Sequence, residues 1–334
     1  MDVAVVVNLR ARRGSEAVGR MVRDLLPRAR VTVTRSLEEV RSFITRELAP
    51  NPPALLLSGG GDGTAVALVN ELRTMEVDLP LIGVLPLGTG NGWAHVTGAP
   101  RARQALEQIA ALRGRTPPTR RFALVESEGQ VAPFLGTGWD AEIVSDFKAQ
   151  LKGLPAGIKT FNDGLGGYLK GMFTRTIPRH MFGSGAANVT LINTGDHAMT
   201  IDENKRIVPL PGGETGKILY RGPGSVAAAA TTPEWGFGFR AFPFAHEAQS
   251  VGRVSCRVYS APVLEATRNM FKLWRGEHPL PKMHDFFLTS GRMEFDRDVP
   301  YQIGGDVAGQ RRAFEFRIAG EGVHLVDWTK LRAA

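Results

Sequence analysis

The sequence contains little of what several large protein classes require. Its 334 residues include one cysteine, Cys256, which excludes an intramolecular disulfide framework and favours a reducing compartment. No apolar run approaches the roughly 18–20 residues of a membrane-spanning helix. At the N-terminus an acidic residue precedes a short apolar run, which is not the pattern of a secretory signal. We therefore expect a cytoplasmic protein that is soluble or bound to a membrane surface.

Several catalytic and binding motifs are also absent. The histidines are dispersed without the spacing of a zinc site, and no Ser-His-Asp arrangement is visible. Neither the P-loop motif nor the Rossmann glycine motif occurs. The net charge of +8 favours an anionic partner. Because no recognition helix or mixed basic and aromatic motif stands out, we expect nucleotide phosphates or an anionic membrane surface and no nucleic acid.

The first third of the chain alternates strand and helix patterns. Unbroken apolar runs predict strands and the segments between them have helical periodicity: strands at 3–7, 31–34, 55–57 and 81–85, helices at 18–26, 37–48 and 64–72. Ser36 and Glu39 have the spacing of a capping box at the start of one helix. This alternation predicts a doubly wound parallel sheet, in which ligands bind at the carboxyl ends of the strands.

Beyond about residue 118 the pattern changes to an alternation of apolar and polar residues. The alternation is clearest at Val254, Cys256 and Val258, and it predicts a mostly antiparallel β-sandwich. Segments 161–173 and 265–274 have helical patterns. We therefore expect an α/β domain over 1–118 and a β-rich domain over 119–334, whose last segment could return to the first domain.

Two glycine-rich loops follow predicted strands at the same edge of the sheet. They are Ser58–Thr64 and Pro86–Gly92. Glycine lets backbone N–H groups approach a phosphate closely, and the N-terminus of a following helix favours the same negative charge. Asp62 would repel a phosphate unless a divalent cation lies between them. A lone loop of this kind is more often a tight turn, but the pair favours a nucleotide site with a metal.

These two motifs resemble the catalytic domain of the diacylglycerol kinase, sphingosine kinase and ceramide kinase superfamily. In that family the motif matched by Gly60–Thr64 holds the phosphates of ATP and Mg²⁺, and the motif matched by Leu85–Asn91 completes the nucleotide pocket. The resemblance extends over the whole chain and is weaker after residue 120. It implies a nucleotide-binding first domain, a lipid-binding second domain and a nucleotide cleft between them.

The resemblance also implies which residues contact the ligands. Those matched to nucleotide contacts are Asn8, Thr34, Gly60, Gly61, Asp62, Gly63, Thr64, Gly88, Thr89, Gly90 and Asn91. Asp62 is in addition the residue expected beside the metal and among the catalytic residues. In the sphingosine and ceramide kinase branch an acidic residue contacts the lipid head group, and Asp140 or Glu142 matches it. Tyr168 matches a tyrosine of the helix that follows.

A candidate general base lies near the end of the chain. Tyr301–Asp306 resembles the segment around the family's Asp-Gly-Glu motif, whose final acid is proposed to deprotonate the lipid hydroxyl, so Asp306 would inherit that role. A primary alcohol needs such a proton acceptor in line with the γ-phosphoryl group. Gly304 replaces the first aspartate of the motif, and Asp306 is one carbon shorter than glutamate. The alternative is that Asp306 is an ordinary turn residue.

Two segments each allow two interpretations of how the protein contacts its lipid. Segment 161–173 is either an interfacial helix on an anionic membrane or a helix that packs on the sheet of the second domain. The aromatic run Trp235–Phe244 lines an acyl-chain cleft or fills the core.

The resemblance as a whole implies an ATP- and Mg²⁺-dependent lipid kinase at the cytoplasmic face of the inner membrane. The expected substrate is a ceramide or sphingoid lipid, or a diacylglycerol. One alternative is a soluble-substrate kinase of the NAD kinase type. Another is a family member that binds nucleotide or lipid without turnover. The oligomeric state stays open, a homodimer being one possibility.

Overall fold

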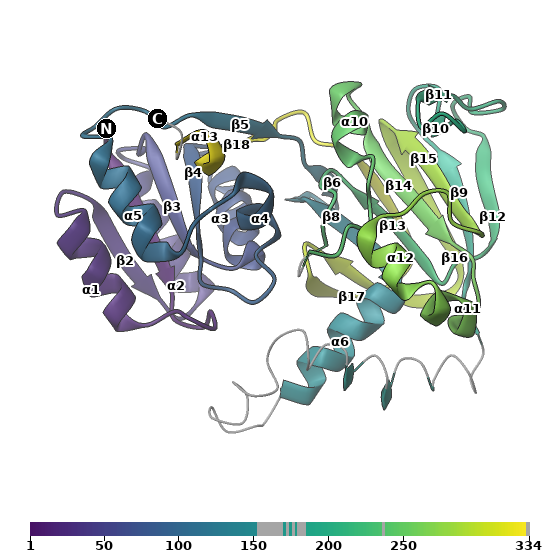
Figure 1. The fold of residues 1–334 in the computed structure, drawn as a ribbon, viewed down its shortest axis with the longest axis horizontal. Helices are drawn as coiled ribbons and strands as arrows, with labels where there is room; N and C mark the ends of the chain where they lie inside the picture. Colours follow the sequence, from purple (N-terminus) through teal and green to yellow (C-terminus); the bar gives the residue numbers. More distant parts are fainter. Residues whose placement is uncertain (152–169, 172–173, 176–177, 179–184, 236–237, 332–334) are drawn as a thin grey trace. The chain divides into compact units, whose positions relative to one another are not determined.

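The computed structural model describes residues 1–151, 170–171, 174–175, 178, 185–235 and 238–331 (Figure 1). The chain divides into two compact units. Unit 1 comprises Met1–Phe122 together with the segment from Gly322 onward, and unit 2 comprises Ala123–Glu321. None of the helices in the described part of the chain combines the length and the apolar character that a membrane span requires.

Unit 1 contains a six-stranded sheet in the order β2-β1-β3-β4-β18-β5. The strands are β1 (Val3–Asn8), β2 (Arg30–Thr34), β3 (Leu55–Gly60), β4 (Leu81–Pro86), β5 (Thr119–Phe122) and β18 (Val323–Val326). Neighbouring strands are parallel except for β5, which is antiparallel to β18. The four strands and the parallel sheet expected for the first third of the chain are confirmed.

Helices cover both faces of this sheet. Successive residues of a strand point to opposite faces, and since the strands are apolar at successive positions, both faces have to be buried. The helices are α1 (Glu16–Leu25), α2 (Leu37–Phe43), the π-helical turn η1 (Ile44–Leu48), α3 (Asp62–Thr74), α4 (Gly92–Thr97), α5 (Ala102–Ala111) and α13 (Trp328–Leu331). On one face, Val5 and Leu57 pack with α1 and α5. On the other, Val6 and Leu56 pack with α2, η1 and α3. The unit is therefore doubly wound.

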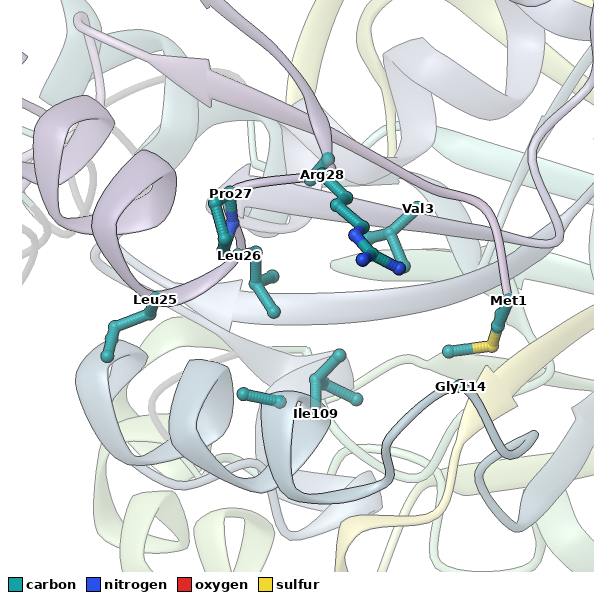
Figure 2. Close-up of a pocket in the computed structure, with 10 residues that line it drawn as sticks. Met1, Val3, Leu25, Leu26, Pro27, Arg28, Ile109 and Gly114 are labelled. Atoms are coloured by element: carbon teal, nitrogen blue, oxygen red, sulfur yellow. The ribbon is translucent and has the colours of Figure 1, made fainter.

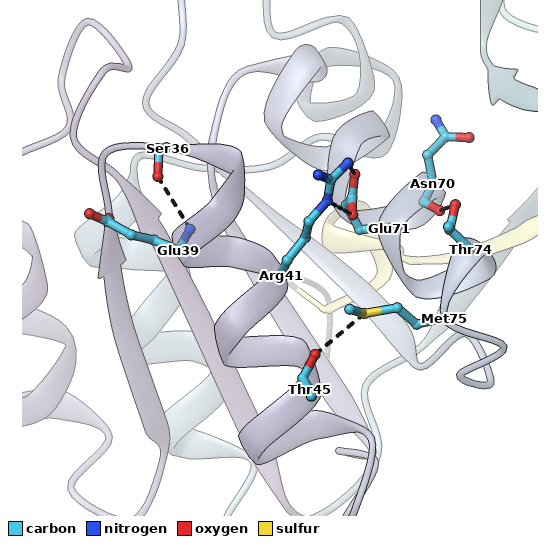
Figure 3. Close-up of polar contacts among 8 residues, drawn as sticks. All are labelled: Ser36, Glu39, Arg41, Thr45, Asn70, Glu71, Thr74 and Met75. Carbon is cyan, nitrogen blue, oxygen red and sulfur yellow. Dashed lines mark hydrogen bonds and ion pairs between the residues drawn. The ribbon is translucent and has the colours of Figure 1, made fainter.

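The start of α2 confirms the predicted cap in part. The hydroxyl of Ser36 accepts a hydrogen bond from the backbone N–H of Glu39 at 3.2 Å (Figure 3). The carboxylate of Glu39 accepts from the N–H of Arg35 at 2.6 Å, one residue before the position that a capping box requires. The predicted helix over 37–48 is also not uniform, because the α-helix ends at Phe43 and a π-helical turn follows.

An ion pair joins α2 to α3. The guanidinium group of Arg41 donates to both carboxylate oxygens of Glu71, at 2.6 and 3.0 Å (Figure 3). Glu71 is buried and Arg41 is exposed, so the pair covers the carboxylate while the cation stays in contact with water. The pair holds in place the helix whose first residue is Asp62.

Unit 2 is built on a twelve-stranded sheet in which the pairs are antiparallel. The strands are β6 (Val125–Ser127), β7 (Gln130–Ala132), β8 (Phe134–Gly138), β9 (Asn188–Asn193), β10 (Met199–Ile201), β11 (Ile207–Pro209), β12 (Ile218–Pro223), β13 (Val226–Ala230), β14 (Val254–Tyr259), β15 (Met283–Leu288), β16 (Ser290–Ile303) and β17 (Asp306–Ile318). The long strand β16 pairs with β17, β8 and β9, so the sheet branches there. The antiparallel second domain is thus confirmed.

The helices of unit 2 differ from expectation at one place. They include α6 (Trp139–Leu151), α10 (Ala245–Ser250), α11 (Val263–Arg268) and α12 (Met270–Arg275). The single helix predicted over 265–274 is interrupted at Asn269, whose φ and ψ of −90° and 4° are not helical. The predicted helix over 161–173 lies largely outside the described residues.

The described part of the aromatic run 235–244 fills the core. Phe242 is 1% exposed, and its ring meets that of Trp235 edge to face at 5.2 Å. Phe134 and Phe239 complete this cluster with Ala228 and its neighbours. These contacts favour the core reading of the segment over an acyl-chain cleft. Residues 236–237 lie outside the described part of the chain.

Candidate nucleotide-binding site

The predicted phosphate loops meet at the point where the strand order of unit 1 reverses. β2 lies on one side of β1, and β3 and β4 lie on the other. Loops that leave the carboxyl ends of two such strands diverge to opposite faces of the sheet and leave a crevice for a ligand. Asn8 ends β1 and Gly60 ends β3. The fold thus brings the first glycine loop to a position typical of nucleotide sites.

Side chains from β1 and α3 join across this point. The amide nitrogen of Asn8 donates to the hydroxyl of Thr64 at 2.9 Å, while its oxygen accepts from the N–H of Arg10, also at 2.9 Å. Thr34 is the register partner of Asn8, and its carbonyl accepts from the N–H of Leu9. Asn8, Thr34 and Thr64, which were predicted separately from three motifs, are therefore neighbours.

The two glycine loops touch each other through backbone atoms. The carbonyl of Gly60 accepts from the N–H groups of Leu87 and Gly88, at 3.0 and 2.9 Å. A Cβ atom added to Gly88 would lie 2.3 Å from the Cα of Gly61, and one added to Gly60 would lie 2.2 Å from the hydroxyl of Thr64. Glycine is required here because any side chain would separate the loops.

Asn91 closes the second loop on itself. Its side-chain oxygen accepts from the N–H of Gly88 at 3.1 Å, and its amide donates to the carbonyl of Gly88 at 2.8 Å. The residue has a φ of 51°, a left-handed conformation that asparagine adopts more readily than most residues. These bonds fix Gly88 and Asn91 relative to each other. Thr89 and Gly90, the remaining predicted nucleotide contacts of this loop, lie between them in the chain.

Asp62 connects the two loops in a way that the sequence did not indicate. Its carboxylate accepts hydrogen bonds from the N–H groups of Gly92 at 2.7 Å and Trp93 at 2.9 Å, the first residues of α4. Burial raises the pKa of this carboxyl group, while the two N–H groups favour its charged form. Asp62 is thus the acid at the N-terminus of α4, supplied from the preceding loop.

The same carboxylate is compatible with the predicted metal. No group of three or more His, Cys, Asp or Glu side chains suited to a metal is found among the described residues. Mg²⁺, however, keeps several waters and is usually held by phosphate oxygens and one or two carboxylates. A carboxylate has about four acceptor positions, so the two bonds to Gly92 and Trp93 leave capacity on Asp62.

The contact between the loops leads to a prediction with a matched control. We expect Gly88→Ala to weaken ATP binding at least about tenfold and to destabilise unit 1 by about 1–3 kcal/mol, because the new methyl group meets backbone that cannot move aside. Gly92→Ala places its methyl group 3.6 Å from the carboxylate of Asp62, an ordinary contact. Calorimetric titration with ATP and denaturant unfolding of both variants test this, and equal behaviour would contradict it.

The candidate base lies on a tight hairpin of unit 2. Gly304 and Gly305 connect β16 to β17 with φ values of 59° and 85°, both left-handed, as a two-residue type I′ turn requires. The side-chain oxygen of Gln302 accepts from the N–H of Gly305 at 2.8 Å. Asp306 follows directly as the first residue of β17 and is exposed. Gly304, the departure from the family motif, thus suits the turn.

The predicted head-group residues belong to α6, with one exception. This helix packs against β8, β16 and β17. The last two are the strands of the hairpin that carries Asp306. Glu142 lies in its first turns and is half-buried. Asp140 is on the same helix, but its side chain lies outside the described part of the structure, as does all of Tyr168.

An apolar pocket of about 220 Å³ lies at the opposite edge of the unit 1 sheet (Figure 2). Its walls include Val3, Leu26 and Ile109, and Arg28 supplies a charged group. None of the residues predicted from the sequence to bind nucleotide lines it. It is therefore separate from the candidate site.

Comparison with known proteins agrees with the motifs. A profile of the diacylglycerol kinase catalytic domain matches residues 2–120. A probable lipid kinase YegS-like protein of Chromohalobacter salexigens is 32% identical over 144 residues, 42% of this chain and 44% of the relative. Lipid kinase YegS of Escherichia coli K12 is 38% identical over 81 residues, 23% of each chain. The matched segments thus span less than half the length of these relatives.

Solved structures extend the likeness of fold to the whole chain. A putative diacylglycerol kinase from Bacillus anthracis has a TM-score of 0.64 at 15% identity and covers 97% of this chain and 96% of its own. An NAD kinase from Archaeoglobus fulgidus in complex with ATP has a TM-score of 0.50 at 12% identity, with full coverage of both chains. At these identities the structures establish the fold. The profile match over residues 2–120 contains both glycine loops, so this part of the chain is similar to the diacylglycerol kinase catalytic domain.

Proposed function

We propose that the protein is a lipid kinase that transfers the γ-phosphoryl group of ATP to a lipid hydroxyl at the cytoplasmic face of the inner membrane. The observation that carries the proposal is the joining of two glycine loops at the strand-order reversal of unit 1, through Asn8, Thr64 and Asp62. The names of the relatives support the lipid acceptor: one is a lipid kinase, another is a probable lipid kinase, and one structural neighbour is a putative diacylglycerol kinase.

In the proposed reaction the lipid oxygen forms a bond to the γ-phosphorus, and the bond from that phosphorus to the bridging oxygen of ADP breaks. Asp306 accepts the proton of the hydroxyl, and the head group is held by Glu142, Asp140 and Tyr168. Gly60–Thr64 and Gly88–Asn91 hold the phosphates through those backbone N–H groups that are not already bonded within the loops, as those of Gly88 and Thr64 are. Mg²⁺, bound with the phosphates beside Asp62, would neutralise charge that develops on the phosphoryl oxygens.

The loop between β1 and α1 adds positive charge to this edge. Arg10, Arg12 and Arg13 are exposed, and none of their guanidinium groups has an acidic partner among the residues that the structure describes. Arg35, after β2, is paired with Glu16 at 2.8 Å instead. We propose that the three unpaired arginines attract the nucleotide phosphates.

Neutralising these arginines gives a test of the nucleotide site. We expect the triple change of Arg10, Arg12 and Arg13 to alanine to raise the KM for ATP about tenfold with little change in kcat, because exposed charges act mainly on encounter and binding. The effect should shrink with added salt. The triple change of Arg20, Arg23 and Arg28 removes the same charge from α1 and the turn after it, and an equal rise there would refute a specific role.

The substrate class is decided by direct assay. Purified protein is incubated with [γ-³²P]ATP, with Mg²⁺ or EDTA, and with diacylglycerol, ceramide, sphingosine, polyprenol or NAD. Label in the organic phase that depends on Mg²⁺ supports the lipid kinase, and thin-layer separation identifies the acceptor. Label on NAD alone supports the soluble-substrate alternative. Binding of ATP without transfer to any acceptor supports a non-catalytic family member.

A further inference from the structure

The two most exposed large apolar side chains of the described residues lie together on the helices α11 and α12. Phe271 is 77% exposed and Leu264 is 66% exposed, whereas Ile218 and Val251, the next in order, are 47% exposed. Exposed apolar side chains that stand singly need no explanation, but these two are far more exposed than the others and lie on helices that follow each other in the chain. We call Leu264, Phe271 and the basic residues beside them the α11–α12 surface.

The inner faces of these helices are already occupied, so the exposed residues cannot turn inward. Ala266 is buried in a cluster with Tyr259, against which Leu273 also packs. Trp274 stacks on Phe239 with ring centres 5.4 Å apart. Since these contacts fix the helices on the sheet of unit 2, the outward position of Phe271 is a property of the fold.

The residues beside the two apolar side chains are cationic. Arg268, Lys272 and Arg275 are exposed on the same two helices. Neither Arg268 nor Lys272 has an acidic partner within the described part of the chain, and Arg275 lies 3.6 Å from Glu277, a loose contact. The acid of α11, Glu265, is paired with Lys282, the residue before β15. The surface therefore combines apolar side chains with positive charge that its own unit does not neutralise.

We propose that the α11–α12 surface docks on an anionic lipid bilayer. Phe271 and Leu264 enter the boundary between head groups and acyl chains, and Arg268, Lys272 and Arg275 bind lipid phosphates. Helices of six residues each are too short to span a bilayer, so the protein lies on the membrane. The inference deepens the proposed function, since it gives a lipid kinase its site of contact with the membrane, but it can be tested without catalysis.

Flotation with vesicles tests the apolar half of the surface. The full chain is mixed with phosphatidylcholine vesicles that contain either no anionic lipid or about one third phosphatidylglycerol. We expect binding to the anionic vesicles, reduced at least about tenfold in the double variant Leu264→Ser/Phe271→Ser. The matched control is Ile218→Ser/Val251→Ser, which removes two exposed apolar side chains elsewhere in unit 2 and should bind as the unchanged protein does.

The charged half is tested in the same assay. Arg268→Gln/Lys272→Gln should lower the partition coefficient on anionic vesicles by at least about tenfold, because each cation near such a surface contributes roughly fivefold. The control Lys205→Gln/Lys217→Gln removes two exposed lysines of other loops. Absence of binding by the unchanged protein, or equal losses in either control pair, overturns the proposal and leaves the surface to another kind of partner.

A second assay separates this inference from the proposed function. Lipid presented in detergent micelles does not require docking on a bilayer, so the Leu264→Ser/Phe271→Ser variant should phosphorylate it at the rate of the unchanged protein. If the unchanged protein transfers no phosphate in micelles but binds anionic vesicles, the kinase proposal fails and the docking surface stands. If it is active in micelles and does not bind vesicles, the reverse holds.

Discussion

Replacing Asp306 with asparagine is expected to lower kcat for lipid phosphorylation by about 10³-fold and to leave ATP affinity unchanged. Asparagine has nearly the same size but cannot accept the proton of the attacking hydroxyl, and general bases contribute roughly 10²–10⁴-fold. The residue is exposed and starts β17 after the turn at Gly304 and Gly305, so the fold should tolerate the change. Single-turnover transfer from [γ-³²P]ATP measures the effect.

Asp306→Glu is the matched variant. It keeps the carboxylate and restores the side-chain length found in the family's Asp-Gly-Glu motif, so we expect kcat within about tenfold of the original. A normal kcat in Asp306→Asn would show that this aspartate is a turn residue and that the base lies elsewhere. Loss of activity in both variants would point to a structural role of the hairpin, which thermal unfolding of the two proteins would then reveal.

Replacing Asp62 with asparagine is the second change with a large expected effect. In the protein each oxygen of the Asp62 carboxylate accepts one N–H group, from Gly92 or Trp93. Asparagine has a single acceptor oxygen and no negative charge, so it replaces these two hydrogen bonds poorly. We expect a loss of about 1–2 kcal/mol in the free energy of unfolding, typical of a lost helix cap. Transfer should fall by roughly 10²–10³-fold, because the two loops no longer hold the phosphates in a fixed arrangement.

The concentration of Mg²⁺ separates two roles of Asp62. If the carboxylate acts only by joining the loops, excess Mg²⁺ does not restore activity to Asp62→Asn. If it also holds the cation, the Mg²⁺ concentration for half-maximal rate rises in the variant. Asp78→Asn, at an exposed position soon after α3, is the control for the loss of one charge. Full activity of Asp62→Asn at low Mg²⁺ would falsify both roles.

Local signals explain why much of unit 1 could be predicted from the sequence. Strands that are buried on both faces have continuous apolar runs, as β1 has over 3–7 and β3 over 55–57, and the pair of glycine loops after β3 and β4 marked the site. Asn8 and Thr64 are 56 positions apart in the sequence, and both were expected at the nucleotide site, although their hydrogen bond was not predicted. Their closeness could be expected because parallel strands bring their carboxyl ends to one edge of the sheet.

Features that depend on distant contacts were not predicted. The segment Gly92–Thr97 is a helix of six residues, too short for periodicity to show, so the bonds from its first N–H groups to Asp62 had no signal. The break at Asn269 is not marked in the sequence by a proline or a glycine. The possible return of the last segment to the first domain was expected, and β18 does lie in the sheet of unit 1, but nothing in Val323–Val326 itself indicates its place between β4 and β5.

The position of β18 affects how the protein folds during synthesis. This strand lies between β4 and β5 in unit 1, yet the whole of Ala123–Glu321 precedes it in the chain. At about 5–20 residues per second, ribosomes need roughly 10–40 s to make that segment. Through that interval β4 has an open edge, and β5 has no partner in its own sheet. The sheet of unit 1 can be completed only after unit 2 has been synthesised, so the order of the units along the chain and the order of their completion are reversed.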